Sequence, residues 1–368
     1  SEMCIRDRYK LLTPGPLTTT ETVKEVMLFD HCTWDDDYKE ITQKIRRDLL
    51  KLAQVEETEY TTVLMQGSGS FGVESVLGSV VPKDGCVLLL SNGAYGERAA
   101  KMCSYYEIPC IHVKQDYNKT PDANEAEELL KTHPEITHIM MIHSETTSGI
   151  LNDIESIGKL AEAYGKVFIV DAMSSFAGVE IPVKDWYIDF LISSANKCIQ
   201  GVPGFSFIIA NRVLLMESKG RARSLCLDLY DQWAGMEKDG KWRYTSPTHV
   251  VLAFEQAMKE LEQEGGIKAR HARYQKNMDT LVENFENLGF RLYVDKAWQG
   301  PIIATFLYPE GKHFDFQEMY AYIKERGYAI YPGKLTDADT FRIGVIGEIY
   351  EEDVLRLTEI MKSYMEQA

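Results

Sequence analysis

Short, wholly apolar runs alternate with amphipathic segments through the first half of the chain. The apolar runs end at Met65, Leu90, Val113, Ile142 and Asp171, and each of the first four is followed by a segment with helical spacing of its apolar residues. Strands that are apolar on both faces are typical of parallel sheets covered by helices on both sides. The sequence therefore predicts an α/β fold in which helices cover a mostly parallel sheet.

A second, smaller α+β unit is predicted after Pro247, where this alternation stops. Its expected helices cover 250–264, 270–287, 314–325 and a terminal segment from about 351, and its expected strands cover 291–294, 301–307, 328–331 and 340–346. We therefore expect a large domain over 9–262 and a small domain over 263–368. Residues 1–8 lack periodicity, and we expect them to be a non-native or disordered leader.

Charge and cysteine usage restrict the function classes. The 368-residue chain has a net charge of −16, which argues against nucleic acid or an anionic membrane surface as partner. No apolar run is long enough to span a bilayer. The seven cysteines are scattered without a C-x-x-C pair, which favours reduced thiols in the cytoplasm and offers no metal-site spacing.

Lys197 lies in a small polar turn between two apolar runs, 188–192 and 205–210. The turn is too short for a helical crossover, so the two strands should run antiparallel. A lysine at a strand end with apolar walls can lose its proton more easily than a surface lysine, as a Schiff-base lysine must. Taken alone, however, the residue fits an ordinary solvated loop lysine much better, and the functional interpretation depends on the segments that precede it.

The segment 66–72 follows a predicted strand and opens a predicted helix, and its sequence is Gln-Gly-Ser-Gly-Ser-Phe-Gly. It matches the G-x-G-x-x-G pattern of dinucleotide sites, but that pattern also needs an acid at the end of the next strand. Here the next strand ends in Leu-Ser-Asn-Gly at 90–93. A single phosphate bound by Ser68, Gly69 and Ser70 fits better, and a tight turn without a ligand remains an alternative.

Four further residues are candidates for binding a planar, anionic ligand. Asp171 ends an apolar strand, where α/β sheets bind ligands, although such residues also cap helices. Tyr95 could stack on a ring and the Thr146 hydroxyl could bond a ring oxygen, but both could simply pack in loops. Arg342 lies opposite Phe341 and Ile343 and could bind a carboxylate or phosphonate, or be an ordinary surface arginine.

In this order along the chain, these residues resemble the class V aminotransferases, which are fold-type I pyridoxal-phosphate enzymes. The resemblance runs from about Leu11 to the C-terminus and includes Leu-Thr-Pro-Gly-Pro-Leu at 12–17, Gln-Gly-Ser-Gly at 66–69 and Ser-Ser-Ala-Asn-Lys at 193–197. Thr-Trp-Asp-Asp-Asp-Tyr at 33–38 and Thr-Ser-Pro-Thr-His at 245–249 resemble the branch that uses 2-aminoethylphosphonate and pyruvate. Ser70 stands where the family often has threonine.

The resemblance implies a pyridoxal 5′-phosphate enzyme that works as a homodimer with shared active sites. Lys197 would carry the cofactor and move the substrate proton, and Asp171 would keep the ring nitrogen protonated. The implied cofactor-binding residues are Ser68, Gly69, Ser70, Tyr95, Thr146, Asp171, Asn196, Lys197 and Thr245, the last from the partner subunit. The implied substrate-binding residues are Arg342, Thr13 and Gly15.

Three alternatives remain at this point. A sister aminotransferase of the same family could use glyoxylate or serine, because a fold does not determine its substrate. The second alternative is a dinucleotide-binding oxidoreductase, and the missing acid that would bind the ribose argues against it. The third is a non-catalytic cofactor-binding module, and the presence of the lysine, the aspartate and the arginine together argues against it.

Overall fold

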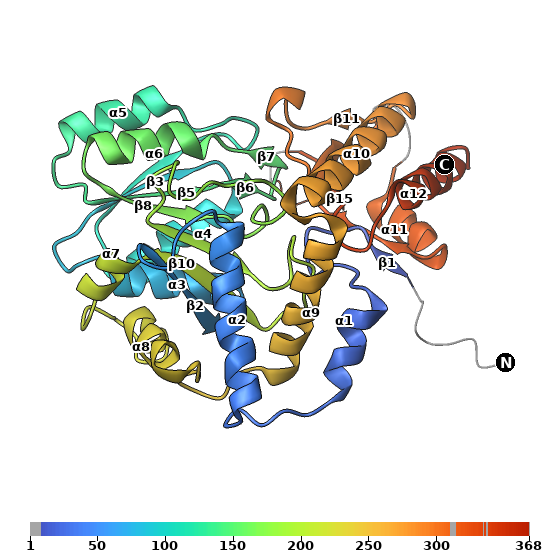
Figure 1. Cartoon of the computed structure of the whole chain (residues 1–368). Helices are drawn as coiled ribbons and strands as arrows, with labels where there is room; N and C mark the ends of the chain where they lie inside the picture. Colours follow the sequence, from blue (N-terminus) through green and yellow to red (C-terminus); the bar gives the residue numbers. More distant parts are fainter. Residues whose placement is uncertain (1–8, 310–313, 334, 336–337, 368) are drawn as a thin grey trace.

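The computed structural model describes residues 9–309, 314–333, 335 and 338–367 (Figure 1). Its centre is a seven-stranded sheet in the order β2-β10-β9-β8-β5-β3-β4. These strands are β2 (Tyr60–Gln66), β3 (Val87–Ser91), β4 (Cys110–Lys114), β5 (His138–Ile142), β8 (Val167–Asp171), β9 (Phe190–Ser194) and β10 (Phe205–Asn211). Only β10 runs against the other six, so the predicted antiparallel pairing of β9 and β10 and the mostly parallel sheet are confirmed.

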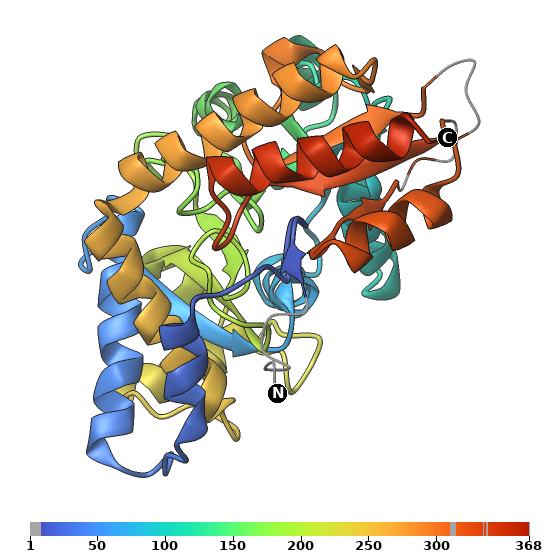
Figure 2. The same cartoon turned by 90° about the vertical axis from the view of Figure 1, so that its right-hand side faces the viewer.

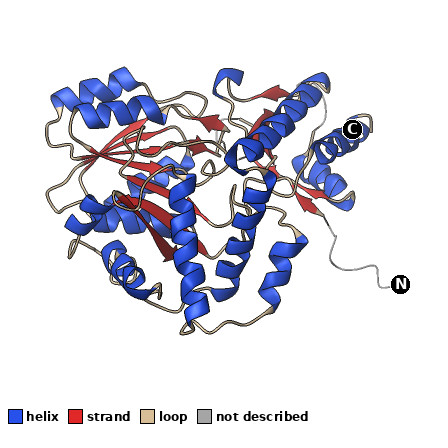
Figure 3. Cartoon of the chain, in the orientation of Figure 1, coloured by secondary structure: helices blue, strands red, loops and turns tan. Residues whose placement is uncertain are grey.

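Helices cover both faces of this sheet (Figure 3), because alternate residues of its apolar strands enter two separate cores. One core is closed by α1 (Glu21–Glu25), α2 (Asp36–Leu52), α5 (Ala123–Thr132), α6 (Ile154–Ala163) and α9 (Thr248–Glu264). The other is closed by α3 (Gly69–Val80), α4 (Ala94–Tyr105), α7 (Arg212–Glu217) and α8 (Leu229–Asp239). In the described part of the chain, no helix is both long and apolar enough to cross a membrane.

The small unit contains a four-stranded antiparallel sheet in the order β11-β12-β15-β14. Its elements are β11 (Arg291–Leu292), β12 (Ile303–Leu307), β14 (Tyr331–Pro332), β15 (Thr340–Gly344), α10 (Gly266–Asn287), α11 (Phe316–Glu325) and α12 (Glu351–Met365). Helices α10 and α12 lie side by side across it (Figure 2). Phe285, Phe306 and Phe341 pack together in its core.

The predicted strand over 328–331 is wrong in one respect, because the structure divides it between two sheets. Its first half, β13 (Tyr328–Ala329), pairs with β1 (Lys10–Leu11), whereas β14 pairs with β15. Ile330 between them is buried in the core of the small unit. The local sequence is apolar throughout, so it does not show that its backbone groups have two different partners.

The beginning of the described chain contacts the small unit before it enters the large one. Leu12 belongs to the small core, and its carbonyl accepts a hydrogen bond of 2.9 Å from the Gly344 amide. A Cβ at Gly344 would lie 2.3 Å from the Thr13 carbonyl carbon, so glycine is needed there. The turn at 13–16 is thereby held between the end of β15 and the Lys197 turn. The domain division remains a proposal, and the leader at 1–8 lies outside the described residues.

Candidate active site

Eight of the predicted residues line one cavity of about 200 Å³ at the carboxyl ends of the parallel strands. Strands β5, β8 and β9 reach it with their last residues, Ile142, Asp171 and Ser194. The eight are Ser68, Gly69, Ser70, Tyr95, Thr146, Asp171, Asn196 and Lys197. This is the edge at which open α/β sheets bind ligands, because loops with different directions diverge there and leave a crevice.

Lys197 is half-buried in the turn between β9 and β10, and its ammonium group contacts the turn at 13–16. Lys197 Nζ donates hydrogen bonds to the carbonyls of Pro14, at 2.9 Å, and Gly15, at 3.2 Å. Gly15 has a φ of +107°, and a Cβ there would lie 2.7 Å from Lys197 Cδ. Glycine at this position thus leaves room for the lysine side chain. In the structure the predicted substrate residue Gly15 contacts Lys197, and its role towards substrate stays a prediction.

Asp171 is the last residue of β8 and is 6 % exposed. Its Oδ1 accepts a hydrogen bond of 2.9 Å from the Met173 amide, which holds the carboxyl group at the cavity wall. Burial raises the pKa of Asp171 to about 6, although the Met173 amide, Lys197 and Arg98 act in the opposite direction. A cationic ring nitrogen beside this carboxyl group would favour its charged form, so the site fits a protonated heterocycle.

The first turn of α3 forms another part of the cavity wall. Helices leave their first amide groups without intrahelical partners, so Gly69 and Ser70 can offer N–H groups to an anion. A Cβ at Gly69 would lie 2.2 Å from Met173 Sδ, which explains the glycine by close packing across the cavity. Ser70 Oγ also accepts a hydrogen bond of 2.9 Å from Arg98 Nη1.

Arg98 is a cavity residue that the sequence reasoning missed. It lies on α4 one turn after Tyr95, and its guanidinium group lies 5.1 Å from the centre of the Tyr95 ring. Its spacing from Tyr95 could have identified it. Residues three apart on a helix share one face, so an arginine three residues after a candidate ring-stacking tyrosine should face the same cavity. The cavity of this acidic protein therefore has a second cation beside Lys197.

Arg342 is buried, so the surface-arginine alternative is excluded. It lies on β15, an inner strand of the small sheet, and donates from Nε to the Pro332 carbonyl at 3.0 Å. Its Nη1 donates to the Thr146 carbonyl at 2.8 Å. Because Thr146 lines the cavity and Arg342 does not, the arginine lies directly behind one wall.

The other two predicted residues do not reach the cavity within this chain. Thr13 is buried and its hydroxyl donates to the Pro16 carbonyl, so it stabilises the turn that Lys197 contacts. Thr245 is exposed in the segment before α9 and is not among the residues that line the cavity. The sequence had assigned Thr245 to the partner subunit's site, and that assignment remains a prediction.

Glu145 is a fully buried carboxylic acid beside the cavity, between Ser144 and Thr146. Its Oε1 accepts hydrogen bonds from the Thr147 amide, at 3.0 Å, and the Thr147 hydroxyl, at 2.6 Å. Its Oε2 has no hydrogen-bond partner among the described residues. Burial raises the pKa of Glu145 to about 7, because the ionised form is poorly solvated there.

Replacing Glu145 with glutamine is expected to stabilise the apoprotein at alkaline pH. The folded-state pKa is raised, so ionisation of Glu145 opposes folding increasingly as pH rises from 4.5 to about 7. The shift corresponds to about 3 kcal/mol, which Glu145→Gln should recover at pH 8.5 but not at pH 4.5. Urea unfolding at both pH values measures this, with Glu283→Gln on the exposed face of α10 as control. Equal stabilisation at both pH values would contradict the assignment.

Comparison with known proteins identifies the family. Residues 31–356 match the family described as aminotransferase class-V. The chain is 56 % identical to a 2-aminoethylphosphonate–pyruvate transaminase of Lysinibacillus sphaericus, with 97 % of each chain covered. It is 55 % identical to a protein of the same name from Bacillus cereus, with 96 % of this chain and 97 % of the relative covered.

Solved structures show the same fold at lower identity. An alanine–glyoxylate aminotransferase of Nostoc superposes with a TM-score of 0.90 at 23 % identity, covering 99 % of this chain and 96 % of that one. A pyridoxamine–pyruvate aminotransferase of Mesorhizobium loti superposes with a TM-score of 0.88 at 23 % identity, covering 97 % and 93 %. The predicted fold is confirmed, and the family model matches most of this chain. The chain therefore belongs to the class V aminotransferases.

Proposed function

We propose that this protein transfers the amino group of 2-aminoethylphosphonate to pyruvate, giving phosphonoacetaldehyde and L-alanine, with pyridoxal 5′-phosphate as cofactor. The observation that carries the proposal is the shared cavity of Lys197 and Asp171 at the carboxyl edge of the sheet. The names of the relatives at 55–56 % identity over nearly the whole chain support this donor and acceptor. Membership in an aminotransferase family argues against the dinucleotide-binding oxidoreductase.

The cavity residues fit this cofactor by their chemistry. The α3 N-terminus, Ser68 and Ser70 offer hydrogen-bond donors to a phosphate, and Arg98 adds a positive charge beside Ser70. Asp171 is a buried residue of the same cavity and could keep a ring nitrogen protonated. Tyr95 supplies an aromatic face, and Thr146 and Asn196 supply polar groups for the ring.

Pyridoxal phosphate, when bound, supplies a carbonyl carbon that accepts an amino group and a ring that withdraws electrons. Lys197 would hold the cofactor through its amine, and the same amine, when uncharged, would be the base that takes the proton from the substrate carbon. Asp171 would stabilise a positive charge at the ring nitrogen. The carbonyls of Pro14 and Gly15 hold the lysine when it is an ammonium group.

We further propose a homodimer in which Thr245 of the partner subunit completes the phosphate site. Leu28, Phe29 and Trp34 are large exposed apolar side chains close together in the sequence, and they support an interface because clusters of such side chains often mark one. Sedimentation of the purified protein tests the dimer.

A reducing, cytoplasmic location is also proposed. The supporting observation is that the six described cysteines are free thiols, namely Cys32, Cys86, Cys103, Cys110, Cys198 and Cys226.

The proposed function is tested by alanine formation from 2-aminoethylphosphonate and pyruvate with purified protein. A panel of donors and acceptors that includes alanine, serine and glyoxylate separates this activity from the related aminotransferase activity. Activity that depends on 2-aminoethylphosphonate and on added pyridoxal phosphate supports the proposal. Preference for alanine or serine with glyoxylate would instead support the sister reaction.

Arg342→Lys is expected to leave the cofactor absorbance intact and to lower kcat/KM for both substrates. Arg342 donates to two carbonyls from behind the cavity wall, and we propose that it also binds the substrate anion, for which a planar guanidinium group offers more donors than one ammonium group. The expected loss is about 2 kcal/mol for Arg342→Lys and up to roughly 5 kcal/mol for Arg342→Ala. Half-reactions with each substrate measure it. Arg326→Lys, whose Nη1 donates to the Tyr322 carbonyl on α11, is the control. Parent-like kinetics of Arg342→Ala would mean that the anion is bound elsewhere.

A further inference from the structure

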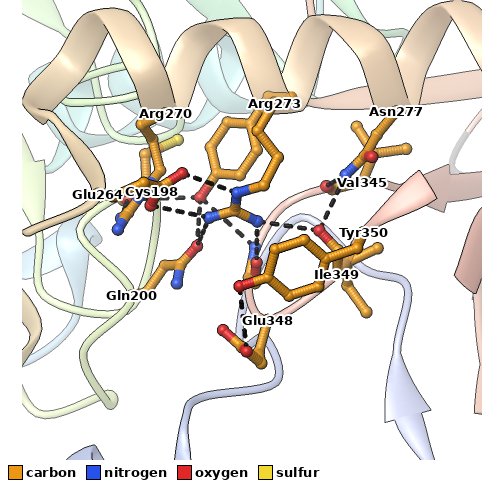
Figure 4. Close-up of polar contacts among 12 residues, drawn as sticks. Cys198, Gln200, Glu264, Arg270, Arg273, Asn277, Val345, Glu348, Ile349 and Tyr350 are labelled. Atoms are coloured by element: carbon orange, nitrogen blue, oxygen red, sulfur yellow. Dashed lines mark hydrogen bonds and ion pairs between the residues drawn. The ribbon is translucent and has the colours of Figure 1, made fainter. Parts of the chain in front are cut away.

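One face of α10 connects the turn of Lys197 to the loop that follows β15. The residues on this face are Arg270, Arg273, Tyr274 and Asn277, spaced one and two helical turns apart. Figure 4 shows the side chains of Arg270, Arg273 and Asn277 reaching from α10 towards Cys198 and Gln200 and towards Val345 and Ile349. The first set follows Lys197 directly, and the second follows the strand of Arg342.

On the lysine side, three residues of α10 bond the turn, Arg270 through a backbone carbonyl and Arg273 and Tyr274 through the Gln200 side chain. Arg270 Nη1 donates to the Cys198 carbonyl at 2.6 Å. The Gln200 amide donates to the Lys197 carbonyl at 2.7 Å, so Gln200 closes the turn around the lysine. The side chain of Gln200 is itself fixed, because its Oε1 accepts from Arg273 Nη2 at 3.0 Å and from the Tyr274 hydroxyl at 2.8 Å.

On the arginine side, the same helix face holds the backbone beyond β15. Arg273 Nη1 donates to the carbonyls of Gly347, at 2.7 Å, and Ile349, at 2.9 Å. Asn277 Nδ2 donates to the carbonyls of Val345, at 3.2 Å, and Ile349, at 3.0 Å. Two residues of this face therefore bridge the Gln200 side chain and the 345–349 loop. Tyr274 does so weakly, because its hydroxyl accepts from the Gly347 amide at 3.5 Å, whereas Arg273 does so with a charged group and shorter bonds.

The position of Arg273 is fixed by the carboxylate of Glu264, which also binds Arg270. Glu264, the last residue of α9, accepts from Arg273 Nε at 2.8 Å and from Arg270 Nε at 2.7 Å. Arg270 is 1 % exposed, so its charge depends on this partner and on the Cys198 carbonyl. Buried hydrogen-bonded charges have few alternative arrangements, because any displacement leaves a charged group without partners.

We propose that Arg273 is a positioning residue that couples the Lys197 turn to the β15 loop and so holds Lys197 and Arg342 in mutual register. It contacts neither side chain directly and acts through Gln200 on one side and through Gly347 and Ile349 on the other. The proposal rests on the proposed function, in which both residues act on one substrate. A shift of one wall against the other then misplaces the substrate anion relative to the lysine.

The first test measures the coupling in the apoprotein by amide hydrogen exchange. In Arg273→Gln, we expect exchange to become about tenfold faster in two segments together, 195–201 and 345–349, because charged hydrogen bonds to both are lost. Arg273→Lys, which keeps the charge but not the fork, should give a smaller change in the same segments. Lys276→Gln is the control on the same helix, because it removes only a solvent-exposed ion pair with Glu351 of α12, and it should change neither segment.

The second test is kinetic and uses the holoenzyme. Arg273→Gln should lower kcat/KM about tenfold for both substrates, with partial recovery in Arg273→Lys. In a double-mutant cycle, Arg273→Gln combined with Arg342→Lys should lose less than the product of the single losses, since both disturb one arrangement. Multiplicative losses, or faster exchange in only one segment, would overturn the coupling. Arg273→Lys carries both tests if Arg273→Gln does not fold.

The two proposals can fail separately. If the parent protein forms no alanine from the proposed substrates, the proposed function fails, whereas the exchange result in the apoprotein is unaffected. If the parent is active and exchange in both segments is unchanged by Arg273→Gln, the inference about Arg273 fails and the function stands.

Discussion

Replacing Lys197 with alanine is expected to abolish transamination and the absorbance of the covalently attached cofactor. The substitution removes the amine that holds the cofactor and also the group that moves the substrate proton. General acid–base catalysis alone contributes about 10²–10⁴-fold, so the combined loss should be at least about 10⁴-fold in kcat. No other lysine lines the described cavity, so another side chain of this wall cannot take over the same role.

Lys197→Arg separates the chemistry of the amine from its charge. Arginine keeps a cation near the carbonyls of Pro14 and Gly15 but does not lose its proton at neutral pH. We expect this variant to be as inactive as Lys197→Ala in single-turnover measurements with 2-aminoethylphosphonate. Lys184→Ala, which removes an exposed ion pair with Glu59, is the control. Substantial turnover by Lys197→Ala, together with the parent absorbance, would refute the assignment.

Local sequence patterns predicted the architecture because the faces that a strand or helix must bury follow from the apolar residues of that segment alone. The wholly apolar strands ending at Leu90, Ile142 and Asp171 need cover on both faces, and the structure buries them in two cores. Helix α8 was missed because its core contacts, such as Leu229 and Trp233, alternate with many polar residues. The division of 328–331 between two sheets was missed because strand pairing depends on partners far away in the chain.

The candidate site was predictable where one residue type is required at one local position. Lys197 in its turn, Asp171 at its strand end and the glycine at 69 are of this kind. The burial of Arg342 against the Thr146 carbonyl, 196 positions away in the chain, is not visible in either segment alone. The same holds for the network of Arg273, whose partners come from three separate regions of the chain.

Asp171→Asn is expected to keep cofactor binding, though weaker, and to lower kcat by at least about 10³-fold, since the charge that stabilises the ring nitrogen is lost. Asparagine can still accept the Met173 amide at Oδ1, so the local geometry should persist. Cofactor titration and single-turnover kinetics with each substrate measure the two effects. Near-normal turnover would refute the proposed role of Asp171.

The expected loss of turnover in Asp171→Asn does not come from a loss of stability, because the raised pKa of Asp171 means that its ionised form opposes folding. Burial raises the pKa of Asp171 to about 6, so at pH 8 the ionised carboxylate opposes folding of the apoprotein, and asparagine removes that cost. Asp189 is the matched control, because burial also raises its pKa to about 6. It accepts from the Phe168 amide at 3.0 Å and lies outside the cavity wall, at the start of β9. Asp189→Asn should therefore alter the pH dependence of stability and leave turnover unchanged, whereas Asp171→Asn should lose turnover without losing stability at pH 8.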